Sequence, residues 1–572
     1  MKQQIFDVVV VGSGAGGLCA AIAARLSGLS AVVLEKEALW GGATAVSGGA
    51  VWVPDNHVAR RAGAQDSIDS ARAYLQELCG DRFDEALVER YLDAGPRVVE
   101  FLESRTAVRF TSPEAYPDYQ SELDGAGSRR VLRPERFDGR LLGPWFETLR
   151  WPLRETMLYG RVSIAPEDVP HLLGMTTSVR SAAYVSRLLL RYAADRMAGA
   201  PRGMKLANGN ALVARLGKSA FDLGIALWLE SPVRRLQVEQ GRVVGVVVER
   251  TGTSVELRAR RGVVLATGGF ANDPGYRRRF HAHVARGCAH YTLVPPGSTG
   301  DGLRFGVEAG GDEGASARNA AVWMPVSLLR DRAGTCRPVA HLLDRLKPGF
   351  IAVDAAGRRF GNESASYQEF VPALLGAAAA SGTPDAYAFL IADHRAVRRY
   401  GMGAQYPAPA PLGAHLRSGY LTRGATLVEL AEKTGLDAAA LVATVARFNA
   451  YAKSGVDPEF GRGETAYQRF MGDPGNLPNP CLGPLDTPPF YAVKIFPGDV
   501  ATCHGLRIDA DARVIDSRGE AIDGLYCAGN DAASIFAGAY PGAGCTLGPA
   551  IVFGTLAGMH LAGRQAALRG SQ

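Results

Sequence analysis

Residues 5–17 read IFDVVVVGSGAGG, an apolar run that passes directly into a glycine-rich turn. The Val-rich part is typical of a strand that is buried on both faces of a parallel sheet. The turn fits the pattern G-x-G-x-x-G, and the small and apolar residues of Leu18–Ser27 indicate a helix after it. A second strand, Ala31–Leu34, ends in the acidic Glu35. This order predicts a Rossmann-type βαβ unit that binds a dinucleotide.

The glycines of the turn have separate roles in this prediction. Gly12 permits the tight turn, Gly14 lets the backbone approach a pyrophosphate, and Gly17 lets the helix pack closely on the strand. The helix N-terminus offers N–H groups and a positive dipole to the phosphates. Glu35 is expected to accept hydrogen bonds from the ribose hydroxyls of the adenosine half. The same site is expected to include Ala15, Gly16 and Lys36.

A second loop rich in Gly, Ser and Thr, WGGATAVSGG over residues 40–49, follows Glu35. NAD-dependent dehydrogenases have no need of such a loop, so it favours FAD. It resembles the G-G-x-[ST]-x-x-S-G-G loop of the fumarate reductase and succinate dehydrogenase flavoprotein superfamily, which wraps the pyrophosphate and ribityl chain. No His-containing signature for covalent attachment lies near this loop, so we expect non-covalent FAD. The resemblance implies cofactor contacts from Gly42, Ala43, Thr44, Ser47, Gly48 and Gly49.

Three later segments resemble further landmarks of that superfamily, in the same order. They are GVVLATGGF at 262–270, STGDG at 298–302 and GLYCAGND at 524–531. After them, a helix over Ala550–Ala562 is expected to point its N-terminus at the flavin, where its dipole favours the anionic reduced ring. The resemblance implies FAD contacts from Val233, Thr267, Gly268, Asp301, Gly529, Asn530 and Leu547.

The predicted fold class is α/β, with a split Rossmann-type FAD-binding domain and an inserted α+β substrate domain. A chain of 572 residues is too long for one compact core. We expect residues 1–290 and 496–572 to form the FAD-binding domain and residues 291–495 the substrate domain. Residues 233–250 and 255–265 are expected to form a β-meander that returns to the Rossmann sheet.

Residues 140–205 are difficult to place. Within them, Val179–Met197 is predicted to be an amphipathic helix with basic residues. One interpretation is a packed surface helix. The alternative is a cap over an apolar substrate entrance that touches a membrane peripherally.

The loop AYPGAGCTLGP, residues 539–549, lies between the last flavin strand and the final helix and should be close to the flavin. The Tyr540 hydroxyl and a glycine N–H would provide two donors for the oxygen of a ketone or enolate. The pattern Y-P-G-x-G with a following T-[IL]-G-P-A resembles the 3-ketosteroid Δ1-dehydrogenase branch of the superfamily. This resemblance implies that Tyr540 and Gly544 hold the substrate carbonyl.

The segment FGNESASY, residues 360–367, resembles the F-x-N-E-S-x-x-Y segment of the same branch. The resemblance implies that Tyr367 is the base that removes the α-proton, while flavin N5 takes hydride from the β-carbon. A free Tyr has a pKa of about 10, so this role requires a stabilised phenolate or a proton relay. Tyr119 is implied as the partner, and Tyr116 competes with it for that role.

These observations favour an FAD-dependent oxidoreductase that introduces a double bond next to a ketone, with 3-ketosteroid Δ1-dehydrogenation as the leading hypothesis. Dicarboxylate members of the superfamily carry an Arg where this chain has Tyr540-Pro541-Gly542, and no Arg occurs from 519 to 563. The alternatives are Δ4-(5α)-ketosteroid dehydrogenation, desaturation of a smaller cyclic ketone, and reduction of an enone or fumarate-like substrate. A flavoprotein subunit of an electron-transfer complex is an alternative from another class.

Composition argues against several other classes of protein. The formal net charge is only +6 without a run of Lys or Arg, so no nucleic-acid partner is expected. The eight Cys form no C-x-x-C and the ten His no H-x-x-x-H, so we expect no metal site. No signal peptide or membrane-spanning stretch is evident, which predicts a cytoplasmic protein. Its expected partners are an apolar ketone, of which a steroid is the leading candidate, and an electron acceptor that the sequence does not identify.

Overall fold

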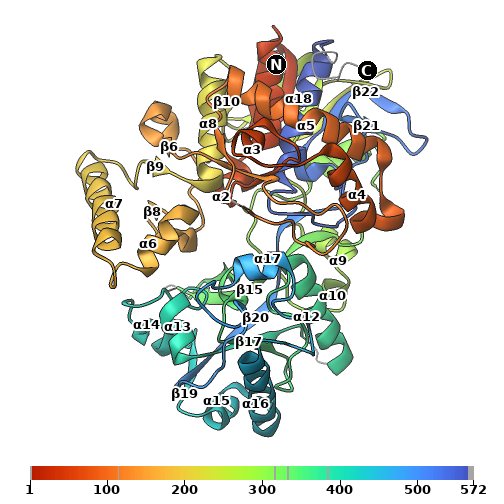
Figure 1. Cartoon of the computed structure of the whole chain (residues 1–572). Coiled ribbons are helices and arrows are strands. Elements are labelled where there is room, and N and C mark those ends of the chain that lie inside the picture. The colour runs from red at the N-terminus through yellow and green to blue at the C-terminus, as the bar shows by residue number, and fades with distance from the viewer. Residues whose placement is uncertain (1–2, 114, 315–316, 332–333, 383–384, 565–572) are drawn as a thin grey trace.

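The computed structural model describes residues 3–113, 115–314, 317–331, 334–382 and 385–564 (Figure 1). Two large β-sheets organise these residues. The elements of the first sheet lie in the upper part of Figure 1, together with both labelled chain ends. The elements of the second sheet lie in the lower part.

The first sheet has eight strands and contains the predicted βαβ unit. Its parallel part runs in the order β10-β2-β1-β13, and β22 also pairs with β13 in parallel. Strands β12 and β11 extend it in antiparallel fashion, so the predicted strands and the β-meander are confirmed. The bounds are β1 Gln3–Val11, β2 Ala31–Leu34, β10 Ala226–Trp228, β11 Val233–Glu239, β12 Arg242–Arg250, β13 Thr253–Leu265, β21 Arg513–Ile515 and β22 Ala521–Cys527.

Helix α1 (Ala15–Leu26) begins at the glycine turn and packs against α18 (Leu547–Leu561), which comes from the other end of the chain. Glycines permit this close approach: a Cβ on Gly554 would lie 2.3 Å from the carbonyl oxygen of Gly16. Both helices were predicted, and each begins a few residues earlier than expected. Helix α8 (Asn208–Asp222) contacts both α1 and the short α2 (Gly42–Val46), while α5 (Glu85–Arg105) contacts α18.

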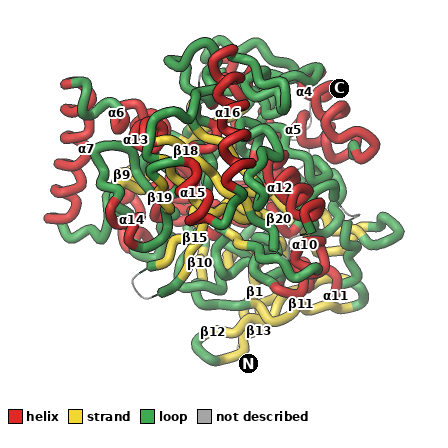
Figure 2. The backbone as a smooth tube through the Cα atoms, turned by 90° about the horizontal axis from the view of Figure 1, so that it is seen from below, coloured by secondary structure: helices red, strands yellow, loops and turns green. Residues whose placement is uncertain are grey.

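The second sheet has seven strands in the order β16-β15-β20-β18-β17, with β14 and β19 also paired to β20. The helices α12 and α15 pack against it, and α16 shares a hydrophobic cluster with β17 and β18. All three helices are seen with its strands from below in Figure 2. The predicted boundary at 495 falls inside β20, so we propose that the substrate domain extends to Thr502. The bounds are β14 Tyr291–Thr292, β15 Ala321–Arg330, β16 Cys336–Ala340, β17 Phe350–Val353, β18 Ala388–Asp393, β19 Thr422–Gly424, β20 Phe490–Thr502, α12 Tyr367–Ser381, α15 Leu427–Thr434 and α16 Ala438–Ser454.

Smaller elements complete the described chain. Three short sheets have the strand orders β3-β5-β4, β6-β9 and β7-β8. Their bounds are β3 Val51–Trp52, β4 Phe110–Thr111, β5 Val131–Pro134, β6 Phe137–Asp138, β7 Met157–Leu158, β8 Val162–Ser163 and β9 Lys205–Leu206. The other α-helices are α3 His57–Arg61, α4 Ile68–Cys79, α6 Val169–Leu173, α7 Val179–Met197, α9 Pro274–Phe280, α10 Ala282–Ala285, α11 Asp301–Glu308, α13 His394–Tyr400, α14 Gly413–Arg417 and α17 Ala466–Met471.

Helix α7 is the helix predicted over residues 179–197, and it stands at the left edge of Figure 1. Its apolar residues divide between two environments. Val185 and Leu188 are buried, whereas Val179, Leu190 and Met197 are 89%, 71% and 84% exposed. Among the described residues, no helix combines the length and the apolar character needed to cross a bilayer. Peripheral membrane contact through α7 stays a prediction.

Candidate active site

A cavity lies at the carboxyl ends of the parallel strands in the first sheet. This is the edge where open α/β sheets bind nucleotides. Ser13, Ser231 and Thr546 line it although the sequence did not indicate them. The predicted FAD contacts that line it are Gly12, Gly14, Ala15, Gly16, Glu35, Lys36, Gly42, Ala43, Thr44, Ser47, Val233, Thr267, Gly268, Asp301, Gly529, Asn530 and Leu547.

Three of the predicted FAD contacts, Gly17, Gly48 and Gly49, are not among the residues that line the cavity. A Cβ on Gly17 would lie 2.1 Å from the carbonyl oxygen of Gly12, so Gly17 allows close packing as expected. A Cβ on Gly49 would lie 2.4 Å from the Asn208 backbone, which makes Gly49 a packing position as well. A Cβ on Gly48 would meet nothing within 4 Å.

The glycine turn and the second loop form one backbone cradle. Gly12 has a φ of +110°, and a Cβ there would lie 2.1 Å from the carbonyl oxygen of Ala266. Thr44 joins the two loops, because its Oγ1 accepts a hydrogen bond of 3.0 Å from the Ala15 N–H. The start of α18 at Leu547 opens on the same cavity. Two helix N-termini and a close backbone therefore fit the pyrophosphate and flavin of FAD.

Glu35, the predicted contact of the adenosine ribose, lines this cavity and is 8% exposed. Burial raises the pKa of its carboxyl group, although hydrogen bonds from Ser13 and Glu37 oppose that effect. The Ser13 hydroxyl donates to Oε2 over 2.5 Å and the Glu37 N–H donates to Oε1 over 3.0 Å. Oε2 also accepts a hydrogen bond from the Ser13 N–H over 3.4 Å, so Oε1 is the oxygen that keeps a lone pair for a ribose hydroxyl.

Asp531 stabilises the turn at Thr267–Gly269 by hydrogen bonds, and it was not among the predicted site residues. Its buried carboxylate accepts hydrogen bonds from the Thr267 hydroxyl (2.9 Å) and the Gly269 N–H (2.8 Å), and also from the Thr267 N–H. These bonds tie the C-terminal segment 524–531 to the turn that follows β13. The position of Asp531 at the end of the GLYCAGND segment was the only signal in the sequence.

Four tyrosines from four separate parts of the chain meet in the second part of the site. The hydroxyl groups of Tyr119 and Tyr367 are 3.0 Å apart and form a hydrogen bond. The ring centre of Tyr540 lies 5.7 Å from that of Tyr119 and 5.6 Å from that of Tyr367. Tyr467, which the sequence did not indicate, has its ring centre 4.6 Å from that of Tyr119. All four rings are buried.

The structure also separates the two candidates for the partner of Tyr367. Tyr119 contacts Tyr367 directly, whereas the Tyr116 ring packs 5.1 Å from Phe470. The geometry thus favours Tyr119. Tyr119 is held against the Tyr540 loop, because its N–H donates to the carbonyl oxygen of Pro541 over 2.9 Å.

Tyr540 borders a second cavity that adjoins the first and shares Gly529, Asn530 and Thr546 with it. Burial raises the pKa of Tyr540, while the backbone amide of Gly544 acts to lower it. Gly544 has a φ of +100°, and a Cβ there would lie 2.5 Å from the Ala50 backbone. Only glycine is therefore compatible with position 544.

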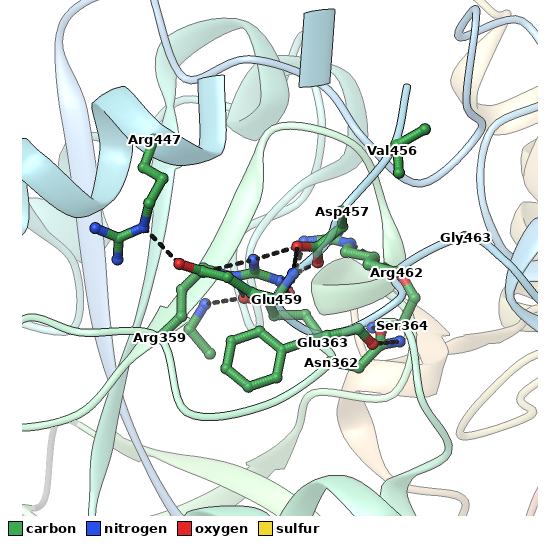
Figure 3. Close-up of polar contacts among 12 residues, drawn as sticks. Arg359, Asn362, Glu363, Ser364, Arg447, Val456, Asp457, Glu459, Arg462 and Gly463 are labelled. Carbon is green, nitrogen blue, oxygen red and sulfur yellow. Dashed lines mark hydrogen bonds and ion pairs between the residues drawn. The ribbon is translucent and has the colours of Figure 1, made fainter. Parts of the chain in front are cut away.

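Tyr367 is the first residue of α12, and the segment before it is anchored by buried ion pairs (Figure 3). Arg359 and Arg462 lie 2.7 Å and 3.1 Å from the Glu363 carboxylate. Arg359 also pairs with Asp457 over 2.8 Å. Burial by itself raises the pKa of Glu363, but the two guanidinium groups outweigh it and lower this pKa to about 2. The ion pairs of Glu363 therefore fix the segment that leads into α12 and Tyr367.

Charges near the tyrosines bear on their acid–base behaviour. Burial raises the pKa of Tyr367 well above 10, and the hydrogen bond from Tyr119 acts in the opposite direction. Arg345 is completely buried, and its Nη2 has no hydrogen-bond partner among the described residues. This guanidinium interacts electrostatically with Tyr467 and Tyr119. Arg345 is thus a positive charge that could stabilise a phenolate in the cluster, and no sequence pattern indicated it.

Comparison with known proteins gives consistent results. The FAD binding domain family matches residues 7–547. The chain is 40% identical over 566 residues to 4-oxocyclohex-2-ene-1-carboxylate 5-dehydrogenase of Sinomonas cyclohexanicum, covering 98% of this chain and 94% of that protein. It is 36% identical over 583 residues to 3-oxosteroid 1-dehydrogenase of Mycolicibacterium smegmatis, covering 100% and 99%.

A solved structure agrees with these relatives. The 3-ketosteroid Δ1-dehydrogenase of Sterolibacterium denitrificans, in complex with 1,4-androstadiene-3,17-dione, matches with a TM-score of 0.88 and 36% identity. The match covers 98% of this chain and 100% of that chain. The predicted fold class, the resemblance to the ketosteroid dehydrogenase branch and FAD as the cofactor are confirmed. The chain belongs to the FAD binding domain family and is an FAD-dependent dehydrogenase of the group that acts on the CH–CH bond next to a ketone.

Proposed function

We propose that this enzyme dehydrogenates the A ring of a 3-ketosteroid at the Δ1 position. The observation that carries the proposal is the hydrogen bond of 3.0 Å between the Tyr119 and Tyr367 hydroxyls, beside Tyr540. In this proposal Tyr367 is the base, Tyr119 is its partner and Tyr540 is the phenol that binds the carbonyl. The steroid complex of the Sterolibacterium protein, which matches this chain over its full length, supports a steroid as the substrate.

The carbonyl is held by two donors in this mechanism. The Tyr540 O–H and the Gly544 N–H donate hydrogen bonds to the ketone oxygen and stabilise the negative charge that develops on it. Donors of this kind, fixed in a buried site, typically contribute about 10²–10³ to the rate. Withdrawal of charge towards the oxygen makes the neighbouring C–H more acidic.

The α-proton then passes to the phenolate oxygen of Tyr367. A raised pKa makes that phenolate a strong base, and the Tyr119 O–H donates a hydrogen bond that lowers the cost of forming it. The buried charge of Arg345 acts in the same direction. Bound FAD supplies the acceptor for the hydride that leaves the β-carbon. Because the phenolate is the active form, the rate is expected to rise with pH.

A smaller cyclic ketone is the second candidate substrate, because the relative with 40% identity is a dehydrogenase of 4-oxocyclohex-2-ene-1-carboxylate. The chemistry at the ketone would be the same. A carboxylate in a buried site needs a cationic partner. The described residues that line the second cavity beside Tyr540 include no charged side chain. The buried Arg345 interacts electrostatically with Tyr467 and Tyr119, so a cation is available near the tyrosines and the two substrates are separated by the experiment that follows.

Anaerobic mixing of the FAD-loaded enzyme with each ketone tests the proposal. Rapid bleaching of the flavin absorbance by androst-4-ene-3,17-dione, with formation of the Δ1 product, is the expected result. Bleaching by 4-oxocyclohex-2-ene-1-carboxylate alone would contradict the steroid assignment. Failure of both ketones to bleach an FAD that dithionite still reduces would contradict ketone dehydrogenation in this direction. Turnover of the purified single chain with an artificial acceptor would count against an obligatory partner subunit.

A further inference from the structure

A buried cluster of three histidines and one aspartate lies where the chain passes between the two sheets. His281 directly precedes α10, His283 lies within α10, and His290 directly precedes β14. Asp499 lies in β20, and its pairing with Thr292 of β14 brings it near His290. The four side chains belong to residues that are at most 6% exposed. The outgoing and returning connections between the sheets therefore meet at polar side chains.

The hydrogen bonds within this cluster are incomplete. His290 Nε2 lies 2.8 Å from Asp499 Oδ2 and His290 Nδ1 lies 3.1 Å from His283 Nε2. His281 Nε2 is 3.9 Å from Asp499 Oδ2, which is too long for a hydrogen bond. Both ring nitrogens of His281 and Asp499 Oδ1 have no hydrogen-bond partner of ordinary geometry among the described residues. Unsatisfied buried polar atoms are destabilising, so a bound group is expected here.

A second buried histidine–carboxylate pair has its hydrogen bonds completed within the protein. His341 Nδ1 lies 2.7 Å from Asp344 Oδ2, and His341 Nε2 lies 2.8 Å from Ser327 Oγ. Both ring nitrogens are thus satisfied by protein atoms alone. His341 provides a matched control for the cluster.

The donor atoms of the cluster suit a transition metal. One ligand atom each from His281, His290 and Asp499 lies within 4.8 Å of the others. Zn²⁺ binds imidazole nitrogen and carboxylate oxygen at about 2.0–2.2 Å, which separates tetrahedral ligand atoms by roughly 3.4 Å. Small side-chain rotations would close that difference. His283 would then accept the Nδ1–H of His290, the supporting hydrogen bond that orients a metal-bound imidazole.

The surroundings of the cluster support the same interpretation. Trp323 packs against the three imidazoles, with ring centres 5.4–6.0 Å apart, and helps to close the site.

We propose that His281, His290 and Asp499 bind one divalent transition-metal ion of the Zn²⁺ type, with His283 as the supporting hydrogen-bond acceptor. This proposal departs from the expectation of no metal site, which rested on local sequence patterns. The ion would join the outgoing segment 281–290 to β20. Because Val500 and Ala501 line the FAD cavity next to Asp499, the ion would also fix this edge of the cavity.

Metal binding is measured on the full-length, FAD-loaded enzyme after treatment with a chelator. Titration with Zn²⁺ is expected to show one ion per chain and a raised melting temperature, and Co²⁺ is expected to give visible ligand-field bands above 500 nm. His290→Ala and Asp499→Asn should abolish both signals. His283→Gln should weaken binding about 10–100-fold, and the control His341→Gln should bind as the wild type does.

The proposal is overturned if the wild type takes up no stoichiometric Zn²⁺ or Co²⁺, since a buried water would then complete the cluster. It is equally overturned if His290→Ala and Asp499→Asn bind as tightly as the wild type, because the ion would then lie elsewhere. If His290→Ala does not fold, His290→Cys replaces it. A new thiolate-to-Co²⁺ charge-transfer band in that variant would place the ion at position 290, and its absence would contradict the assignment.

Discussion

The FAD cradle and the tyrosine cluster lie next to each other, yet they are built in opposite ways. The cradle consists largely of backbone from short stretches such as residues 12–17 and 41–47, where glycine at position 12 is required by φ and by a close carbonyl. The cluster consists of side chains from segments far apart, with Tyr119 and Tyr367 separated by 248 positions. One therefore depends on local conformation and the other on how the two sheets are joined.

This difference predicts how each part responds to substitution. A change in the tyrosine cluster should lower the rate and leave FAD bound, because the phenols do not form the cradle. A change in the cradle should weaken FAD binding and leave the rate of the FAD-loaded enzyme unchanged. The following substitutions test this division.

Tyr367→Phe should have the largest effect on the rate. Loss of the general base typically costs about 10²–10⁴ in rate, while the phenyl ring preserves the packing against Tyr540. Single-turnover bleaching by the ketone measures the effect, and flavin content should equal that of the wild type. Tyr467→Phe is the control, because Tyr467 contacts Tyr119 but has no assigned proton transfer, and its rate should stay within tenfold. A rate of Tyr367→Phe within tenfold of the wild type would refute its role.

Glu363→Gln should mainly reduce stability, by about 3–5 kcal/mol, because it leaves Arg462 buried without its carboxylate. Urea unfolding measures this loss, and Glu429→Gln, in an exposed pair with Lys433, should cause no measurable loss. The stability difference between wild type and Glu363→Gln should shrink as the pH falls. The folded pKa of Glu363 is about 2 against an ordinary 4.5, so its stabilisation is complete above pH 4.5 and disappears as the pH falls towards 2. A difference between variant and wild type that persists unchanged at pH 2 would contradict this account.

Tyr540→Phe should lower the rate by about 10²–10³ through the loss of one donor to the carbonyl oxygen. FAD should remain bound, although Tyr540 borders the cavity that adjoins the cradle. Steady-state kinetics with the ketone and the flavin spectrum of the purified variant test the two statements separately. Full activity would exclude the role of Tyr540, and loss of FAD would show that the cradle and the cluster are not independent.

The same division explains which features the sequence could predict. The strand, glycine turn, helix and Glu35 occur consecutively, so their spacing is enough to place them. Tyr540, Tyr367 and Tyr119 were implied by family resemblance, because nothing local says that they meet. Tyr467 and Arg345 were not predicted, because they come near Tyr119 only when the second sheet packs against the Tyr119 segment. The cluster of His281, His290 and Asp499 could not be predicted either, because its carboxylate lies in β20, 209 positions after His290.

Thr44→Val should have the smallest effect and is the sharpest test of the cradle. Valine matches the shape of threonine but cannot accept the hydrogen bond from the Ala15 N–H, which is 3.0 Å long. A hydrogen bond of this kind is worth about 0.5–1.5 kcal/mol, so the FAD dissociation constant should rise roughly 2- to 13-fold. Fluorescence titration of the apoprotein measures it, and Thr44→Ser, which keeps the oxygen, should bind as the wild type does. The rate at saturating FAD should not change, since Thr44 joins the two loops at the start of α1. A slower rate at saturation would instead place Thr44 beside the reacting ring and remove the separation between cradle and cluster.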